Sequence, residues 1–175
     1  GISCWGLERH DVRIAALERA VELNPNCSLA HCSLGAALGI SGRTDEAITR
    51  QEIAIRMNPR DPSIFFRFSG LALAHYQAGR YAAAADWAEK SARRMPRWYF
   101  AHFVLAASLV ALDRVEEARH AAATCHEHLP DVSLVDLGRV PLRNGAQMAC
   151  LRERLKAAGF GVVSQDPTNQ VSAGS

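Results

Sequence analysis

The chain has 175 residues, of which 49% are hydrophobic and 22% are charged, and its formal net charge is +2. This length suffices for one well-buried domain of ordinary globular composition, and the near-neutral charge favours neither nucleic acid nor an acidic membrane as a partner. No apolar run reaches the roughly 18 residues needed to cross a bilayer, so we expect no membrane span. The first residues do not have the pattern of a signal peptide.

Helix-like segments that end in proline recur along the chain. The closing prolines are Pro25, Pro59, Pro96 and Pro130, separated by 34, 37 and 34 residues. A small residue stands five positions before each of them, at Ala20, Ala54, Ser91 and Cys125, and a second small-residue column holds Ala47, Ala84 and Ala118. A turn marker precedes each later closing helix, at Gly42, Gly79 and Asp113. Such self-similarity at a fixed period indicates a repeat architecture.

Each unit is predicted to contain two helices of about 12 to 15 residues, because its apolar residues recur with a spacing near 3.6. Short side chains in register let the two helices approach closely, and the proline ends the second helix because it lacks an N–H. No unit buries its apolar stripe alone, so neighbouring units must stack. The sequence therefore predicts an all-α solenoid.

The pattern resembles the tetratricopeptide repeat (TPR). Leu34-Gly35 match the Leu-Gly of its opening motif, and Leu71-Ala72 and Leu105-Ala106 take the same places in the later units, while His31, Phe68 and His102 stand at its Trp position. The resemblance implies a right-handed TPR superhelix of antiparallel helix pairs. The full units are 28–61, 62–98 with a three-residue insert at 62–64, and 99–132.

The two ends depart from this register. Residues 1–27 form a partial first repeat, and the register puts Gly1 midway along a first helix, so we expect a fragment of a longer protein. Residues 133–160 are predicted to form a loop and a C-terminal capping helix, on which Met148, Leu151, Leu155 and Ala158 share one face. The polar segment 161–175 is expected to be a disordered tail.

No motif in the chain predicts catalysis, a cofactor or a metal site. CHEHLP (125–130) holds a thiol and two imidazoles, but residues two apart on a helix point about 200° from each other, so His126 and His128 cannot converge on one ion. RRMPRWYF (93–100) combines arginines with aromatic residues, which we interpret as a turn between repeats and not as a nucleic-acid site. Five cysteines without a CxxC pair favour reduced thiols and a cytoplasmic location.

The resemblance implies a binding groove on the concave face, formed by the first helix of each unit. The residues at its binding positions are mostly apolar, and we take as candidates Leu29, Cys32, Ala36, Phe66, Leu73, Tyr76, Phe100, Phe103, Ala107 and Val110. The Lys, Asn and Arg with which some members grip a terminal carboxylate are absent, so the predicted ligand is a hydrophobic or amphipathic peptide segment. The alternatives are that the C-terminal helix or a second copy of the chain fills the groove.

A narrower resemblance rests on GLALAHYQAGRYAAAADWAEKS, the longer third unit and LRERLKAAGF. These features look similar to the C-terminal repeat region of some bacterial adenylate/guanylate cyclases, and to regions that follow winged-helix domains in bacterial regulators. The resemblance implies a role in signal transduction, in which any enzyme activity belongs to the parent protein. The sequence therefore predicts a non-catalytic protein-binding scaffold, with a cyclase regulatory region or a self-association module as alternatives.

Overall fold

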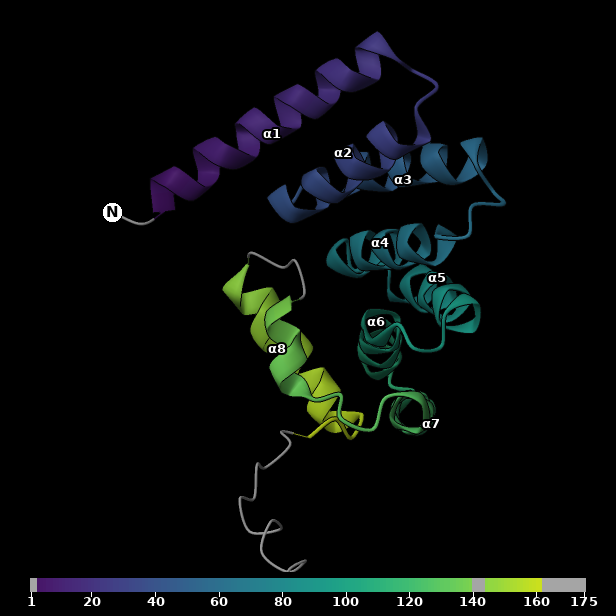
Figure 1. The fold of residues 1–175 in the computed structure, drawn as a ribbon. Coiled ribbons are helices and arrows are strands. Elements are labelled where there is room, and N and C mark those ends of the chain that lie inside the picture. The colour runs from purple at the N-terminus through teal and green to yellow at the C-terminus, as the bar shows by residue number, and fades with distance from the viewer. Residues whose placement is uncertain (1–2, 140–143, 162–175) are drawn as a thin grey trace, which may run out of the picture.

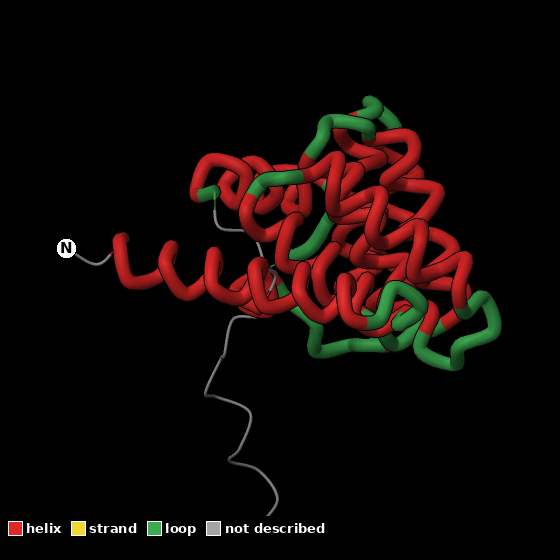
Figure 2. The backbone as a smooth tube through the Cα atoms, turned by 90° about the horizontal axis from the view of Figure 1, so that it is seen from above, coloured by secondary structure: helices red, strands yellow, loops and turns green. Residues whose placement is uncertain are grey.

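The computed structural model describes residues 3–139 and 144–161, and over these residues the chain is helical with no strand (Figures 1 and 2). The elements are α1 (Ser3–Leu23), α2 (Ser28–Ser41), α3 (Thr44–Met57), α4 (Ile64–Gln77), α5 (Tyr81–Arg94), α6 (Tyr99–Ala111), α7 (Val115–His128), the 3-10 helix η1 (Leu134–Arg139) and α8 (Gly145–Ala157). Apart from Gly161, the predicted tail lies outside the described residues, as do residues 140–143 of the predicted loop. None of the described helices is both long enough and apolar enough to span a membrane.

The predicted turn markers reverse the chain within each repeat. The marker residues Gly42, Gly79 and Asp113 have φ angles of 88°, 74° and 60°, which lie in the left-handed region. The residue after each marker donates its N–H back into the preceding helix, from Arg43 to Leu38 at 3.0 Å, from Arg80 to His75 at 2.9 Å and from Arg114 to Leu109 at 2.9 Å. This closure pairs α2 with α3, α4 with α5, and α6 with α7.

The small-residue columns lie where the helices pack most closely. Ala47, Ala84 and Ala118, together with Ala54, Ser91 and Cys125, are fully covered from solvent. Ser91 also donates its hydroxyl to the Phe65 carbonyl oxygen at 2.7 Å, which ties α5 to α4. Short side chains at these positions let the pairs stack into the predicted superhelix.

Histidine replaces the large aromatic residue at the opening position of two repeats. Nε2 of His31 lies 2.9 Å from the carbonyl oxygen of Pro25, and Nε2 of His102 lies 2.9 Å from that of Pro96. Each imidazole thus binds the closing proline of the repeat before it. In the third unit Phe68 instead packs on Trp87, with ring centroids 5.4 Å apart. Burial lowers the pKa of His102, so this ring stays neutral in the fold.

The first helix differs from the prediction. The repeat register places a break between two helices near residue 8, but α1 runs without interruption from Ser3 to Leu23. The other three breaks need a residue that adopts a positive φ, and the matching position in the first unit is Glu8. A glutamate is a good helix former and disfavours the left-handed conformation, so the helix continues.

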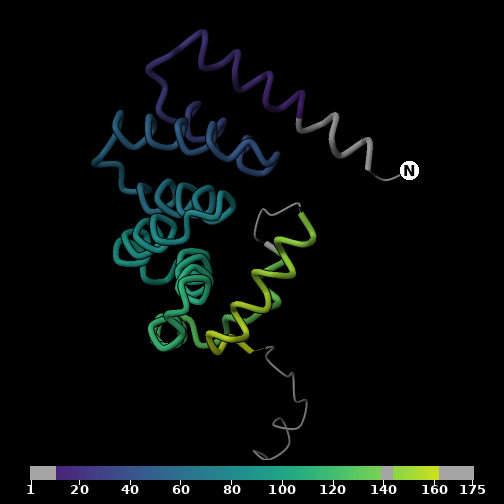
Figure 3. Tube along the Cα trace, turned by 180° about the vertical axis from the view of Figure 1, so that it is seen from behind, coloured from purple at the N-terminus to yellow at the C-terminus, as the bar shows by residue number. Residues whose placement is uncertain are grey.

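The helices form two rows, with α8 on one side of them. In Figure 1, α8 lies on the side of α4 and α6, opposite α5 and α7, and the view from behind in Figure 3 shows the same arrangement. The side that carries α2, α4 and α6 is the concave face, and α8 packs mainly against α6. Leu151 and Leu155 of α8 are completely buried in this contact.

Candidate functional site: the concave face

Helix α8 covers the part of the concave face that belongs to the fourth repeat. Phe103 on α6 is completely buried, and its ring packs edge-on against Phe160, with centroids 4.9 Å apart. Phe160 also lies against the imidazole of His126, at 5.3 Å. The candidate residue Phe103 is therefore accessible to a ligand only when this segment moves away.

Arg154 fixes the position of α8 against the third repeat. Its guanidinium donates to the hydroxyl of Tyr76 at 2.9 Å and to the hydroxyl of Tyr81 at 3.3 Å. The same group lies 4.6 Å from the centre of the Tyr81 ring, within the range of a cation–π contact. Burial raises the pKa of Tyr76, so its phenol remains a neutral partner. Because these contacts are directional, they fix the position of α8 on the repeats, which apolar contacts alone would not define.

The ten predicted groove residues fall into three groups. Four line a cavity that α8 leaves open: Ala36, Phe66, Leu73 and Phe100. Four belong to or pack against the apolar cluster that α8 completes: Tyr76, Phe103, Ala107 and Val110. The other two lie apart, with Cys32 buried and Leu29 exposed over 68% of its surface. Burial also raises the pKa of the Cys32 thiol, which lies near Arg67.

The open cavity has a volume of about 250 Å³ and lies between α2, α4 and the start of α6. Phe66 stands at this site with half of its surface exposed, and its ring centre lies 5.9 Å from that of Trp98. Glycines on α2 and α4 line part of the wall, at Gly35, Gly39 and Gly70. No side chain in the lining carries a charge, so the site suits an apolar group.

The other lining residues of this cavity, Gln51 and Trp98 among them, were not among the predicted groove residues. Gln51 lies on α3, the second helix of its unit, which the repeat rule excludes from the groove. A signal was present, because Gln51 occupies the column that holds Ala88 and Ala122 in the later repeats. Burying a polar side chain costs free energy unless it is hydrogen-bonded, so a glutamine in a column of buried alanines indicates a hydrogen-bonding environment at that position.

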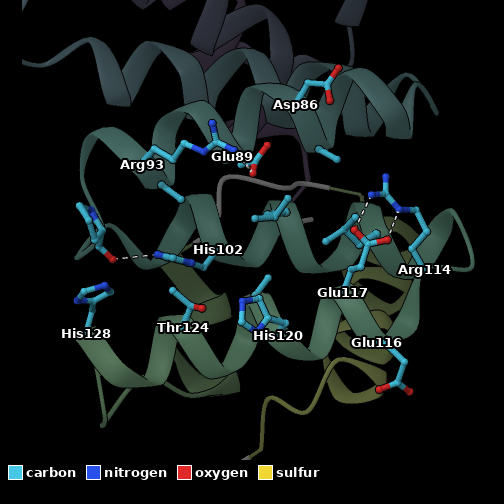
Figure 4. Close-up of a pocket in the computed structure, with 16 residues that line it drawn as sticks. Asp86, Glu89, Arg93, His102, Arg114, Glu116, Glu117, His120, Thr124 and His128 are labelled. Carbon is cyan, nitrogen blue, oxygen red and sulfur yellow. Dashed lines mark hydrogen bonds and ion pairs between the residues drawn. The ribbon is translucent and has the colours of Figure 1, made fainter.

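A second cavity of about 610 Å³ lies on the convex face, between α5 and α7 with α6 beneath it (Figure 4). Its charged groups are largely paired within their own helices. Arg114 makes two hydrogen bonds to Glu117, of 2.7 and 2.6 Å, and Arg93 binds Glu89 at 2.6 Å. His102 is held by the Pro96 carbonyl, as described above. We therefore interpret this surface as a groove of solvated ion pairs.

The thiol and imidazoles of the 125–130 segment form no reactive cluster. Cys125 is completely buried, and burial raises its pKa to about 12. A thiol in this state is neither a nucleophile nor a ready metal ligand. Over the described part of the chain, no group of three or more His, Cys, Asp or Glu side chains could hold a metal ion.

Comparisons with known proteins agree with the repeat fold. Residues 1–27 match the family described as tetratricopeptide repeat, and residues 40–125 match that of anaphase-promoting complex, cyclosome, subunit 3. A search of curated proteins gave no match.

Similar solved structures share the fold. The crystal structure of MamA is similar with a TM-score of 0.65 and 15% identity, over 85% of this chain and 86% of that one. The structure described as MamA MSR-1 C2 has a TM-score of 0.61 and 21% identity, over 87% of both chains. The crystal structure of YrrB, described as a TPR protein with an unusual peptide-binding site, has a TM-score of 0.60 and 17% identity, over 87% and 78%.

The stacked helix pairs define an all-α repeat solenoid. The repeat register, the matched families and the similar structures together support a tetratricopeptide-repeat protein. Proteins of this family are generally non-catalytic, and their repeats generally bind protein or peptide partners.

Proposed function

We propose that this chain is a scaffold that binds a hydrophobic or amphipathic peptide segment on the open part of its concave face. The observation that carries the proposal is Phe66, a large apolar side chain that remains half exposed beside an uncharged cavity. Exposed aromatic residues next to a pocket are the usual anchors of peptide recognition. The bound segment would contact Ala36, Phe66, Leu73 and Phe100.

The groove residues beneath α8 have a different role in this proposal. Charging Phe103 would remove the packing of Phe160 and release α8, so it would not test ligand binding alone. We propose that α8 occupies the fourth-repeat share of the groove as an internal segment. The remaining share, between α2 and α4, takes the external peptide.

A displayed library of random peptides, selected on the intact chain, tests the proposal. Selected peptides should bind the wild-type chain and lose at least 10-fold in affinity for Phe66→Glu, because the charge would face an apolar ligand. Val12→Glu is a matched control, since Val12 is another exposed hydrophobic residue, at 69%, and lies on α1. Failure to select any peptide, or equal binding to Phe66→Glu, would contradict the proposal.

Three finer expectations remain predictions. Cys27, Cys32, Cys125 and Cys150 are free thiols, which supports a reducing compartment such as the cytoplasm. A regulatory role in a bacterial nucleotide cyclase requires a cyclase domain in the parent protein. Self-association through the concave face predicts a dimer by light scattering at high concentration, and a strictly monomeric species would contradict it.

A further inference from the structure

Two residues that line the cavity on the concave face, Gln51 and Gln77, each have a hydrogen-bond acceptor that nothing in the described residues satisfies. The amide nitrogen of Gln51 donates to the carbonyl oxygen of Cys32 at 3.2 Å, and that of Gln77 donates to the carbonyl oxygen of Gly39 at 3.2 Å. The side-chain oxygens of both glutamines are buried without a partner. Gln51 as a whole is only 2% exposed.

The orientation of both amides follows from these contacts. Turning either amide over would bring its oxygen against a carbonyl oxygen, which repels it, so the nitrogen must face the backbone. The free atoms are therefore acceptors in both cases. A buried acceptor without a partner is costly, and a ligand that donates a hydrogen bond would remove that cost.

The rest of the lining restricts the kind of donor. Because no residue around the cavity is charged, a lysine or arginine side chain would lose its hydration without gaining a counter-ion. A neutral donor has no such cost. Phe66 and Trp98 add aromatic surface, which favours a flat ring that packs edge to face or offset.

The size of the cavity restricts the ligand further. Its volume of about 250 Å³ is below the roughly 300–1,000 Å³ of sites for drug-sized molecules, so it suits a single large side chain. The side chain of tryptophan is a flat apolar ring with one N–H group that donates a hydrogen bond, and it has no acceptor. This matches a site whose unsatisfied polar atoms are acceptors only.

We infer that the cavity receives the indole ring of a tryptophan in the partner peptide, with the indole N–H donating to the oxygen of Gln51 or Gln77. This inference rests on the proposed peptide-binding function and specifies the residue that anchors the peptide. Phe66 and Trp98 would pack against the ring.

A comparison of indole with benzofuran separates the contribution of the N–H donor to binding from that of the aromatic ring. The two molecules have nearly the same shape, and only indole has an N–H. Each probe is titrated into the nitrogen-15-labelled chain, and the amide signals are followed by NMR. Indole should shift the amide signals of Gly35, Gly39 and Gly70. Benzofuran should bind about 10-fold more weakly, since it leaves the buried acceptor unpaired. Equal binding of the two probes, or no binding of indole, would overturn the inference.

Gly39→Ala provides a variant that keeps the fold. The added methyl would lie 3.6 Å from the oxygen of Gln77 and 3.7 Å from Cβ of Ala47, both ordinary contacts, and so would add bulk beside that oxygen without strain. We expect indole binding to weaken about 10-fold if that oxygen is the acceptor, and to weaken less if Gln51 accepts the bond, because the methyl still narrows the cavity. Gly145→Ala, at an open helix position far along the chain, is the matched control and should bind as the wild type does. Unchanged binding of indole by Gly39→Ala would overturn the inference.

The peptide selection separates this inference from the proposed function. Selected peptides that share a tryptophan, and lose affinity when it becomes phenylalanine, support both. Peptides that bind the Phe66 surface without any preference for tryptophan leave the proposed function intact and overturn this inference. A selection that yields no peptide contradicts the proposed function itself, even if free indole binds.

Discussion

Helix α8 should detach from the superhelix when its aromatic anchor is removed, while the repeats stay folded. Phe160 is 2% exposed and packs on both Phe103 and His126. Truncation of a fully buried phenylalanine to alanine costs about 3–5 kcal/mol. Because α8 contacts α6 far more than any other helix, Phe160→Ala should lower the free energy of docking α8 by about 3 kcal/mol.

Hydrogen exchange measures this docking free energy for each helix separately. A loss of about 3 kcal/mol corresponds to a drop of roughly 100-fold in the protection of α8 amides, since about 1.4 kcal/mol equals a factor of ten. The amides of α2 to α5 should keep their protection. Cys150→Ala, an exposed position on the same helix, is the control and should change little.

Two results would refute the reasoning about α8. If protection fell equally in all helices, α8 would be part of one cooperative unit and not a segment docked on a stable stack. If protection of α8 did not change at all, the contacts of Arg154 and the buried leucines would be sufficient without Phe160. Either result would also weaken the division of the concave face into a covered and an open part.

The remaining predictions concern the turn, a partly exposed carboxylate and the thiols. Gly42→Ala should lower the free energy of unfolding by about 1–2 kcal/mol in urea denaturation, because φ is 88° there and nothing else obstructs the methyl. Hydrogen bonds from Ser63, together with the nearby Arg67 guanidinium, lower the pKa of Asp61 from 3.8 to about 2. Its stabilising effect is therefore present above about pH 4 and is lost as the pH falls towards 2, and Asp61→Asn should flatten acid unfolding over that range. Iodoacetamide should label exposed Cys150 in the native chain but reach buried Cys125 only after unfolding, as measured by mass spectrometry of peptides.

The helix pairs could be predicted from the sequence because each repeat column specifies a local requirement. A glycine or aspartate marks the residue with a positive φ, a small residue marks close approach, and a proline marks the end of a helix. The first unit lacks the turn residue, so the same reasoning, applied to the register alone, predicted a break that α1 does not contain. The position of a residue in the repeat therefore predicts a turn less well than the presence of a residue that adopts a positive φ.

The candidate site was less predictable, because the docking of α8 depends on contacts between distant segments. The apolar face of Leu151 and Leu155 predicts that this helix packs on something, but apolar contacts have no direction and do not identify the surface. The pairing of Arg154 with Tyr76 and Tyr81 fixes the surface, and these residues lie more than 70 positions apart in the sequence. The repeat rule placed Phe66 and Phe103 in the same groove, yet only Phe66 remains open to solvent.

Gln51 and Gly35 form a complementary pair beside the open cavity. In the later units its column holds Ala88 and Ala122, and the facing column holds Ala72 and Ala106 where the second unit has Gly35. A methyl on Gly35 would lie 3.0 Å from Cγ of Gln51, so the longer side chain on one helix requires the missing side chain on the other.

This exchange of volume predicts a specific coupling. Gly35→Ala alone should destabilise the chain by about 1–3 kcal/mol through overpacking, whereas the same change in a Gln51→Ala background restores the alanine pair of the later repeats and should cost less. A double-mutant cycle from urea denaturation should therefore give a coupling of at least about 1 kcal/mol. Additive costs would mean that glycine and glutamine are independent, and that the cavity does not depend on their pairing. A measured coupling would tie the packing of α2 on α3 to the position of Gln51, which holds one of the two acceptors of the proposed indole site.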